Sequence, residues 1–167
     1  MVFLIAAISD NNIIGVQNKL PWKLKNDLRW FKLHTLYGAV IMGRKTWLSL
    51  PKKPLVNRLN IICSRNCTEK IEGNVVWVSS FERALKKAKF YSRHTYIIGG
   101  GEIFHLALAN HVVDTLILTR VHKNIEQKNS DKLIDLTLPT TKQLIYRSVD
   151  QIENKIKYHF EMYNLKI

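Results

Sequence analysis

The sequence predicts an α/β fold: a mostly parallel, twisted sheet of eight strands with helices on both faces and an antiparallel hairpin at its C-terminal edge. Short apolar runs alternate along the chain with segments whose apolar residues recur at helical spacing, which is the pattern of buried strands covered by helices. Near the end of the chain, I-K-Y-H-F-E-M-Y alternates apolar and polar residues instead, as a strand with one covered face does. A length of 167 residues, 46% of them hydrophobic, predicts a single domain over 1–167.

The first half of the chain supplies the elements in a clear order. An apolar run at 2–8 ends in polar turn formers and predicts the first strand. A long loop at 9–24 follows, and loops of this length inside a compact domain are usually functional. A helix is expected at 25–36, closed by Gly38. The next expected elements are a strand at 39–43 with a short helix directly after it, and a strand at 59–64.

The second half continues the alternation and then changes character. A strand at 75–78 precedes a helix at about 80–90, capped by Ser79 or Ser80. Further strands are expected at 96–101, which opens into a helix ending near 109, and at 114–121, before an exposed polar segment at 122–135. The terminal hairpin is expected at about 144–150 and 155–165 around a turn at 154–155, with one face formed by Ile156, Tyr158, Phe160 and Met162.

The chain is strongly basic, with a formal net charge of +13 from 26 Lys and Arg against 13 Asp and Glu. Such a surplus suits nucleic acid, but the basic residues are scattered, without a run of five or a recognisable nucleic-acid module. Attraction of small anionic substrates explains the charge equally well. We expect small-molecule partners, with no nucleic acid.

The sequence also indicates a location. No apolar run approaches the ~20 residues that span a bilayer, and the N-terminal apolar run lacks the basic leader of a signal peptide. Cys63 and Cys67 have poor zinc spacing and no clustered histidines, so we expect neither a metal site nor a disulfide framework. The expectation is a cytoplasmic protein, monomeric and not bound to a membrane.

One acidic residue stands on an apolar helix face. Leu24, Leu28 and Phe31 recur at helical spacing, and Asp27 shares their face. Water favours the ionised carboxylate, so burial raises the pKa of such a group unless a partner holds its charge. Asp27 is therefore either a structural cap or ion pair, or a group that awaits a cationic or proton-donating ligand.

Glycine and basic residues gather where three expected strands end. Gly99–Gly101 follow one strand and open a helix, M-G-R-K-T at 42–46 follows a second, and C-S-R at 63–65 follows a third. Glycine lets a ligand approach closely, a helix start offers free N–H groups to phosphate, and a hydroxyl beside a guanidinium suits the 2′-phosphate of NADP. Each segment alone is also explained by a tight turn or an exposed charge. Three in one sheet favour a nucleotide site, because ligands bind beyond the carboxyl ends of such strands.

Several motifs taken together resemble the dihydrofolate reductase family. They are I-A-A at 5–7, I-G at 14–15, L-P-W at 20–22, D-L-R-W-F at 27–31, V-I-M-G-R-K-T-W at 40–47, I-I-C-S-R at 61–65, I-G-G-G at 98–101 and L-T at 118–119. L-P-W, D-L-R-W-F and M-G-R-K-T in this order are specific to the family, whereas I-G-G-G alone is not. The resemblance is close over about residues 3–121 and looser in the terminal hairpin.

The resemblance implies NADPH-dependent reduction of 7,8-dihydrofolate to 5,6,7,8-tetrahydrofolate, which supplies one-carbon and thymidylate metabolism, and inhibition by antifolates. Asp27 matches the family's single buried carboxylate, which fixes the pterin and favours the protonation of N5 by water while hydride reaches C6. Trp22 would order water near this site. The segment around Leu20 would close over the nicotinamide and exclude water.

The resemblance also assigns residues to the two ligands. The reaction site comprises Asp27, Trp22 and Leu20. Matched substrate positions are Ile5, Ala7, Asp27, Leu28, Phe31, Leu50, Leu55, Arg58, Ile98 and Thr119. Among these, Arg58 matches the clamp on the glutamate carboxylate. From its position alone, Arg58 could equally be a surface arginine. Matched cofactor positions are Ala7, Ile14, Gly15, Asn18, Leu20, Gly43, Arg44, Lys45, Thr46, Cys63, Ser64, Arg65, Ile98, Gly100, Gly101, Glu102 and Ile103.

The chain departs from the family's pattern in three places. Leu20 stands where many relatives have Met, and Phe104 stands where many have Tyr, so a hydroxyl near the nicotinamide is missing. The late motif D-T-x-F-P appears only as D-L-T-L-P at 135–139, after a longer loop.

Two other functions remain open at this point. A pyrimidine reductase of riboflavin synthesis shares the fold and the glycines, but does not predict L-P-W with D-L-R-W-F. A nucleic-acid binder would explain the charge, and its affinity for duplex would fall steeply with salt.

Overall fold

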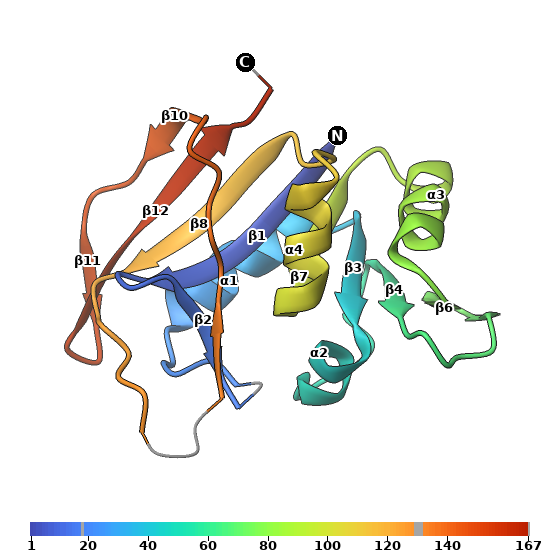
Figure 1. The fold of residues 1–167 in the computed structure, drawn as a ribbon, viewed down its shortest axis with the longest axis horizontal. Helices are drawn as coiled ribbons and strands as arrows, with labels where there is room; N and C mark the ends of the chain where they lie inside the picture. Colours follow the sequence, from blue (N-terminus) through green and yellow to red (C-terminus); the bar gives the residue numbers. More distant parts are fainter. Residues whose placement is uncertain (18, 129–131, 167) are drawn as a thin grey trace.

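The computed structural model describes residues 1–17, 19–128 and 132–166 (Figure 1). Its centre is a sheet in which the strands follow the order β10-β12-β8-β1-β7-β3-β4-β6-β5, with β11 paired to β12. The strands that run parallel are β1 (Val2–Ser9), β3 (Ala39–Gly43), β4 (Leu59–Cys63), β6 (Val75–Val78), β7 (Thr95–Gly99) and β8 (Thr115–Val121). These bounds agree with the predicted parallel α/β sheet.

The antiparallel strands lie at the two edges. β12 (Ile156–Asn164) pairs with β8, and β10 (Gln143–Arg147) and β11 (Gln151–Glu153) both pair with β12. At the other edge, β5 (Lys70–Glu72) pairs with β6. Among the described residues this sheet has ten strands where the sequence predicts eight. The difference comes from β5 and β11, which are three residues long and carry no apolar run for a pattern to detect.

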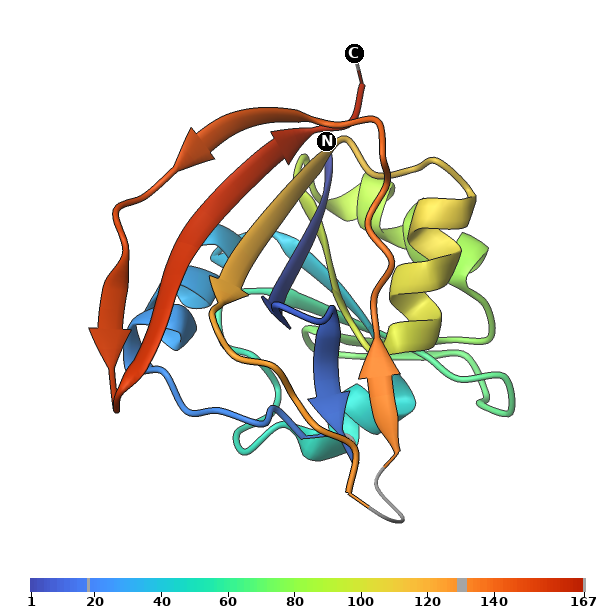
Figure 2. The ribbon, with the colours of Figure 1, turned by 60° about the vertical axis from the view of Figure 1, so that its left-hand side comes forward.

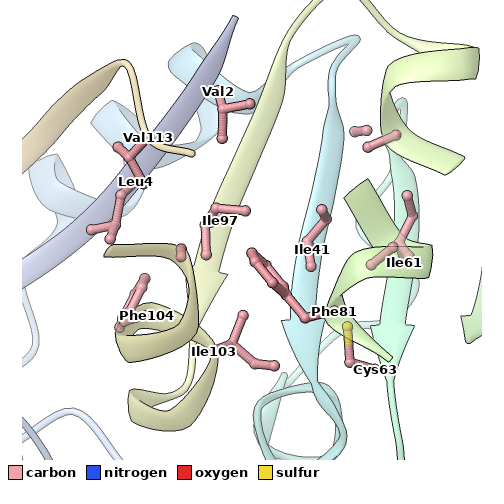
Figure 3. Close-up of a cluster of buried hydrophobic side chains, with 14 of the residues drawn as sticks. Val2, Leu4, Ile41, Ile61, Cys63, Phe81, Ile97, Ile103, Phe104 and Val113 are labelled. Atoms are coloured by element: carbon pink, nitrogen blue, oxygen red, sulfur yellow. The ribbon is translucent and has the colours of Figure 1, made fainter. Parts of the chain in front are cut away.

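Helices cover both faces of the sheet (Figure 1). They are α1 (Lys25–Thr35), α2 (Arg44–Ser49), α3 (Phe81–Tyr91) and α4 (Gly101–Ala109). One buried cluster joins α3 and α4 to alternate strand residues such as Leu4, Ile41 and Ile97 (Figure 3). The residues between them, such as Ile5 and Val40, pack with aromatic side chains of α1 and α2 on the other face. Consecutive residues of a strand therefore lie on opposite faces of the sheet, because side chains alternate along the strand.

A second, two-stranded sheet was not expected from the sequence. β2 (Ile13–Val16) pairs antiparallel with β9 (Leu133–Asp135), so parts of the segments predicted as a long loop and as an exposed excursion form one ribbon (Figure 2). The ribbon lies close to α4, because a Cβ at Gly101 would lie 2.6 Å from Ile134 Cγ2. Glycine at 101 permits this close approach.

Gly38 has a different role from the one predicted. Helix α1 ends at Thr35, and Tyr37 rather than Gly38 has a positive φ, of 62°. A Cβ at Gly38 would lie 2.7 Å from Tyr96 Cε2, so the absence of a side chain serves packing against β7. In contrast, Ser80 caps α3 as one of the two predicted candidates, accepting a hydrogen bond from the backbone N–H of Arg83. No described helix is long and apolar enough to cross a membrane.

Candidate active site

A cleft of about 1240 Å³ lies where the parallel strands end, and α1 forms part of its wall. Strands β7, β3 and β4 are neighbours in the sheet, so the three glycine-rich or basic segments that follow them lie side by side. The L-P-W segment and the β2–β9 ribbon complete the lining. The cleft therefore joins the acidic helix face and the strand-end segments, which the sequence analysis treated separately.

Asp27 is buried in this cleft, with 9% of its surface exposed. Thr119 of β8 donates a hydrogen bond from Oγ1 to Asp27 Oδ1 at 2.5 Å. Burial raises the pKa of Asp27 from 3.8 to about 6, the Thr119 hydrogen bond lowers it, and the charge of Glu153 raises it further. Within the described residues no Lys, Arg or His forms an ion pair with Asp27. The carboxylate is thus desolvated without a cation, a state typical of functional groups.

Glu153 positions the helix that carries Asp27. The N-cap residue Leu24 has no side-chain hydrogen bond to offer, and Glu153 replaces it from the hairpin. Its two carboxylate oxygens accept hydrogen bonds from the backbone N–H groups of Lys25 at 2.7 Å and Asn26 at 3.3 Å. A carboxylate at a helix N-terminus is favoured by the helix dipole, so this contact fixes the first turn of α1.

Apolar and aromatic side chains surround the carboxylate. Trp22 is 6% exposed and packs with Leu24 and Tyr158. The indole N–H groups of Trp22 and Trp30, which both line the cleft, have no hydrogen-bond partner within the described chain. Buried donors are costly when unsatisfied, so both are available to a ligand or to water.

The segments that follow β7, β3 and β4 form one arm of the cleft, here called the strand-end arm, and its glycines let a ligand approach the backbone closely. Gly99 has a φ of +117°, which favours glycine, and a Cβ at Gly100 would lie 3.3 Å from Thr46 Oγ1. Arg65 contacts Glu102 at 3.9 Å, but both side chains are mostly exposed, at 85% and 69%. A surface pair of this kind is weak, so Arg65 is free to bind an anionic group.

Most of the residues assigned by the resemblance line this cleft. They are Ile5, Ala7, Ile14, Gly15, Leu20, Trp22, Asp27, Leu28, Phe31, Gly43, Arg44, Lys45, Thr46, Leu50, Cys63, Ser64, Arg65, Ile98, Gly100, Gly101, Glu102, Ile103 and Thr119. Asn18 lies outside the described residues. The roles given to these residues stay predictions.

Leu55 and Arg58 are not part of the lining. Arg58 is also not the surface arginine that its position alone suggested, since only 8% of it is exposed. Its Nε donates to the backbone carbonyl of Val56 at 3.0 Å and its Nη1 donates to Thr35 Oγ1 at 3.0 Å. These two contacts hold the guanidinium against the end of α1, which the sequence could not show because Thr35 is 23 positions away.

The lining residues that the sequence did not assign include two groups at strand ends and in the ribbon. Ser79 and Ser80 follow β6, and Lys132 to Asp135 belong to the β9 segment. The rule used for the other strand ends would have found the two serines, because β6 is the next parallel strand in the sheet. The β9 residues carried no local signal, since their place depends on pairing with β2.

Fold and site together define a class: an open α/β protein whose cleft lies at the carboxyl ends of parallel strands, with glycine-rich and basic segments at those ends and one desolvated carboxylate. The chain belongs to the dihydrofolate reductase family, since the family model described as dihydrofolate reductase matches residues 1–165.

Known relatives agree with this assignment. The chain is 46% identical over 103 residues to a dihydrofolate reductase of Buchnera aphidicola from Acyrthosiphon pisum, a match that covers 62% of each protein. It is 37% identical over 155 residues to the dihydrofolate reductase of Candida albicans, covering 86% of the chain and 80% of the relative. The chain spans less than two thirds of the first relatives it matches, and only 33% of a bifunctional dihydrofolate reductase-thymidylate synthase of Paramecium tetraurelia.

A solved structure shows the same fold. It is the dihydrofolate reductase from Enterococcus faecalis complexed with NADP(H) and RAB-propyl, with a TM-score of 0.84 and 28% identity. The match covers 100% of this chain and 97% of that one. The predicted fold class is thereby confirmed, and family membership favours the first of the three functions considered from the sequence.

Proposed function

We propose that the protein reduces 7,8-dihydrofolate to 5,6,7,8-tetrahydrofolate with NADPH, and that it binds antifolates in the same cleft. The carrying observation is the desolvated carboxylate of Asp27, which lacks a cation and shares one cleft with the glycine-lined and basic strand ends. The names of the relatives and the NADP(H) bound to the Enterococcus faecalis enzyme support the proposal.

Asp27 acts as the anchor for the pterin in this proposal. A carboxylate with one oxygen held by Thr119 accepts further hydrogen bonds from the pterin N3–H and 2-amino groups, which fixes the ring. Its negative charge favours a proton at N5, delivered by a water that the indole N–H of Trp22 helps to order. Because burial raises the pKa of Asp27 to about 6, the carboxyl group can take up and release a proton close to neutral pH.

The residues of the strand-end arm fit a dinucleotide cofactor. Gly99 and Gly100 leave room beside Thr46 that a Cβ would fill, and Arg44 and Lys45 offer positive charge next to it. Ser64 and Arg65 suit a 2′-phosphate. When bound, NADPH would supply the hydride, while these side chains hold and orient it.

Arg58 lies at the far end of the substrate region in this proposal. Its Nε and Nη1 are held by Val56 and Thr35, which leaves Nη2 without a protein partner among the described residues. A guanidinium fixed on one side is pre-organised to take a carboxylate on the other, as the clamp on the glutamate tail requires.

The direct test is consumption of NADPH in the presence of dihydrofolate. We expect the absorbance of reduced nicotinamide to fall only when both compounds are present, and an antifolate to stop the reaction. The substrate of the riboflavin-pathway pyrimidine reductase serves as the comparison. Turnover of that compound, or none of dihydrofolate, would contradict the proposal.

Arg65→Ala tests the cofactor arm separately. Loss of a charge-assisted contact to a 2′-phosphate is expected to raise the KM for NADPH by roughly tenfold. The KM for NADH, which lacks that phosphate, should change little. Arg93→Ala, which removes an exposed arginine that does not line the cleft, is the matched control. Equal effects on both cofactors would refute the 2′-phosphate assignment.

A further inference from the structure

The β8–β12 ladder has a second face, turned away from Asp27. Thr119 and its partner Phe160 face the side of α1, so Arg120 and His159, which pair with each other, face the opposite side. His122 follows β8 and donates its backbone N–H to Lys157. His122 and His159 are therefore diagonal neighbours on this outer face, within reach of one another.

Three potential metal ligands converge there. His122 Nε2 lies 2.9 Å from His159 Nδ1, and Asp150 Oδ1 lies 3.5 Å from the same His159 Nδ1. One ligand atom from each of the three residues lies within 4.8 Å of the others. His159 is nearly buried, with 4% of its side chain exposed, while His122 and Asp150 are partly exposed, at 31% and 36%. Within the cluster, His159 is thus held in place by the surrounding protein, whereas His122 and Asp150 can be reached from solvent.

The other ring nitrogen of each histidine meets a carboxylate. His159 Nε2 lies 2.6 Å from Glu161 Oε1 in a buried contact, and a carboxylate oxygen there accepts when this nitrogen carries the hydrogen. His122 Nδ1 lies 3.4 Å from Asp10 Oδ1. Histidine ligands of metals typically donate their second N–H to a carboxylate in this way, which fixes the tautomer and raises the basicity of the ligating nitrogen.

This arrangement leaves the inner nitrogens facing one another as lone pairs. If each ring donates to its carboxylate, His122 Nε2 and His159 Nδ1 are both acceptors, and Asp150 Oδ1 is a third acceptor beside them. Three converging acceptors need a hydrogen or a cation between them, and the 2.9 Å between the two ring nitrogens admits a hydrogen bond when no metal is bound. Two imidazole nitrogens and one carboxylate oxygen are a ligand set that suits Zn²⁺ and related transition metals, with water at the remaining position.

We propose that His122, His159 and Asp150 bind one divalent transition cation, of which Zn²⁺ is the best match, on the face of the sheet opposite the cleft. This site is independent of the proposed reductase activity. It would join the ends of β8 and β12 to the segment before β11, and would stabilise the fold by binding the native state alone. No metal site was expected from the sequence, where only the spacing of Cys63 and Cys67 was considered. His122 and His159 form no motif, because they are 37 positions apart.

Cations of the protein compete for Asp150. Arg147 Nη2 and Lys157 Nζ each lie 3.1 Å from one of its oxygens. On the inner side, Arg120 lies 3.7 Å from Glu161 and so balances that carboxylate. A bound metal must displace Arg147 from Asp150 Oδ1 and coexist with Lys157. Removing a competing cation should therefore tighten metal binding, whereas a variant that merely unfolds would bind the metal more weakly.

The first experiment titrates the metal-free protein with ZnCl2 in a calorimeter and follows thermal unfolding in parallel. We expect one Zn²⁺ per chain and a raised Tm. His122→Gln and Asp150→Asn should each weaken binding roughly tenfold or more. His111→Asn is the matched control, because His111 is exposed and lies outside the cluster. Several weak equivalents that all variants share would overturn the proposal.

The second experiment uses a substitution that should strengthen Zn²⁺ binding. Lys157→Gln removes one competing charge at a side chain that is 53% exposed, and should tighten Zn²⁺ binding roughly 3- to 10-fold. In the unmodified protein, one equivalent of Zn²⁺ should shift the imidazole nitrogen signals of two of the six histidines. Unshifted imidazole signals, or weaker binding by the Lys157 variant, would contradict a metal site at these residues.

Discussion

Glu161 and Asp27 are buried carboxylates on opposite faces of the β8–β12 strand pair, and their electrostatic surroundings differ. Glu161 of β12 is 7% exposed and lies against His159, Arg120 and the hydroxyl of Tyr163. Asp27 is 9% exposed, and within the described parts of the chain its one hydrogen-bond partner is the hydroxyl of Thr119, with the negative charge of Glu153 nearby. A carboxylate whose charge is compensated stabilises a fold, whereas an uncompensated one weakens it and becomes reactive toward a ligand. The difference separates a structural acid from a candidate catalytic one at equal burial.

The largest expected effect is on activity. Asp27→Asn should lower turnover near pH 7 by roughly 10²-fold or more, because the amide neither carries the charge that favours protonation of N5 nor exchanges a proton. Part of the activity should return at low pH, where the solvent supplies the proton. Steady-state rates of NADPH oxidation measure this. Near-native turnover at neutral pH would remove Asp27 from the reaction.

Glu161→Gln should instead leave the chemistry intact and damage the fold. The change deprives Arg120 and His159 of a buried negative partner, which should lower the free energy of unfolding by roughly 2 to 3 kcal/mol. Urea unfolding of the variant and the parent protein gives this difference. If turnover fell while stability was unchanged, the contrast between the two acids would be wrong.

Asp27→Asn should have the opposite effect on stability. Because the pKa of Asp27 is raised from 3.8 to about 6, its contribution to stability is fully present below pH 3.8 and is lost as the pH rises through 6. Asparagine does not ionise, so the variant should be more stable than the parent by about 3 kcal/mol above pH 6. The advantage should vanish at about pH 3, which urea unfolding at both pH values would reveal. A constant difference across this range would mean that the carboxylate is not desolvated.

The smallest expected effect is electrostatic and acts at a distance. Glu153→Gln keeps an oxygen for the backbone N–H of Lys25 but removes the charge that raises the pKa of Asp27. The pKa of Asp27 should fall by a few tenths of a unit, and the pH–rate profile should move to lower pH by the same amount. Glu72→Gln, an exposed change on the far edge strand, should leave the profile in place. An unmoved profile for both variants would limit Glu153 to capping α1.

Local sequence patterns placed some residues of these two regions correctly. Helical spacing put Asp27 on the apolar face of α1, and alternation put Tyr158 and Phe160 on the covered face of β12. These patterns did not reveal which of the two acids has a cation beside it. The distinction depends on which charges each acid meets: Arg120 reaches Glu161 from the neighbouring strand β8, whereas Glu153 brings a negative charge to the start of α1 across 128 positions.

The sequence by itself determined the parallel strands, the cleft at their carboxyl ends and the buried acid, because periodicity and turn chemistry are local and parallel strands share one edge for their ends. Only the tertiary structure decided the β2–β9 ribbon, the burial of Arg58 against Thr35, the Glu153 cap and the His122–His159 pair. Each of these depends on a contact between residues that are far apart in the chain. Such a contact leaves no period or motif, and its energy depends on neighbours that folding alone brings together.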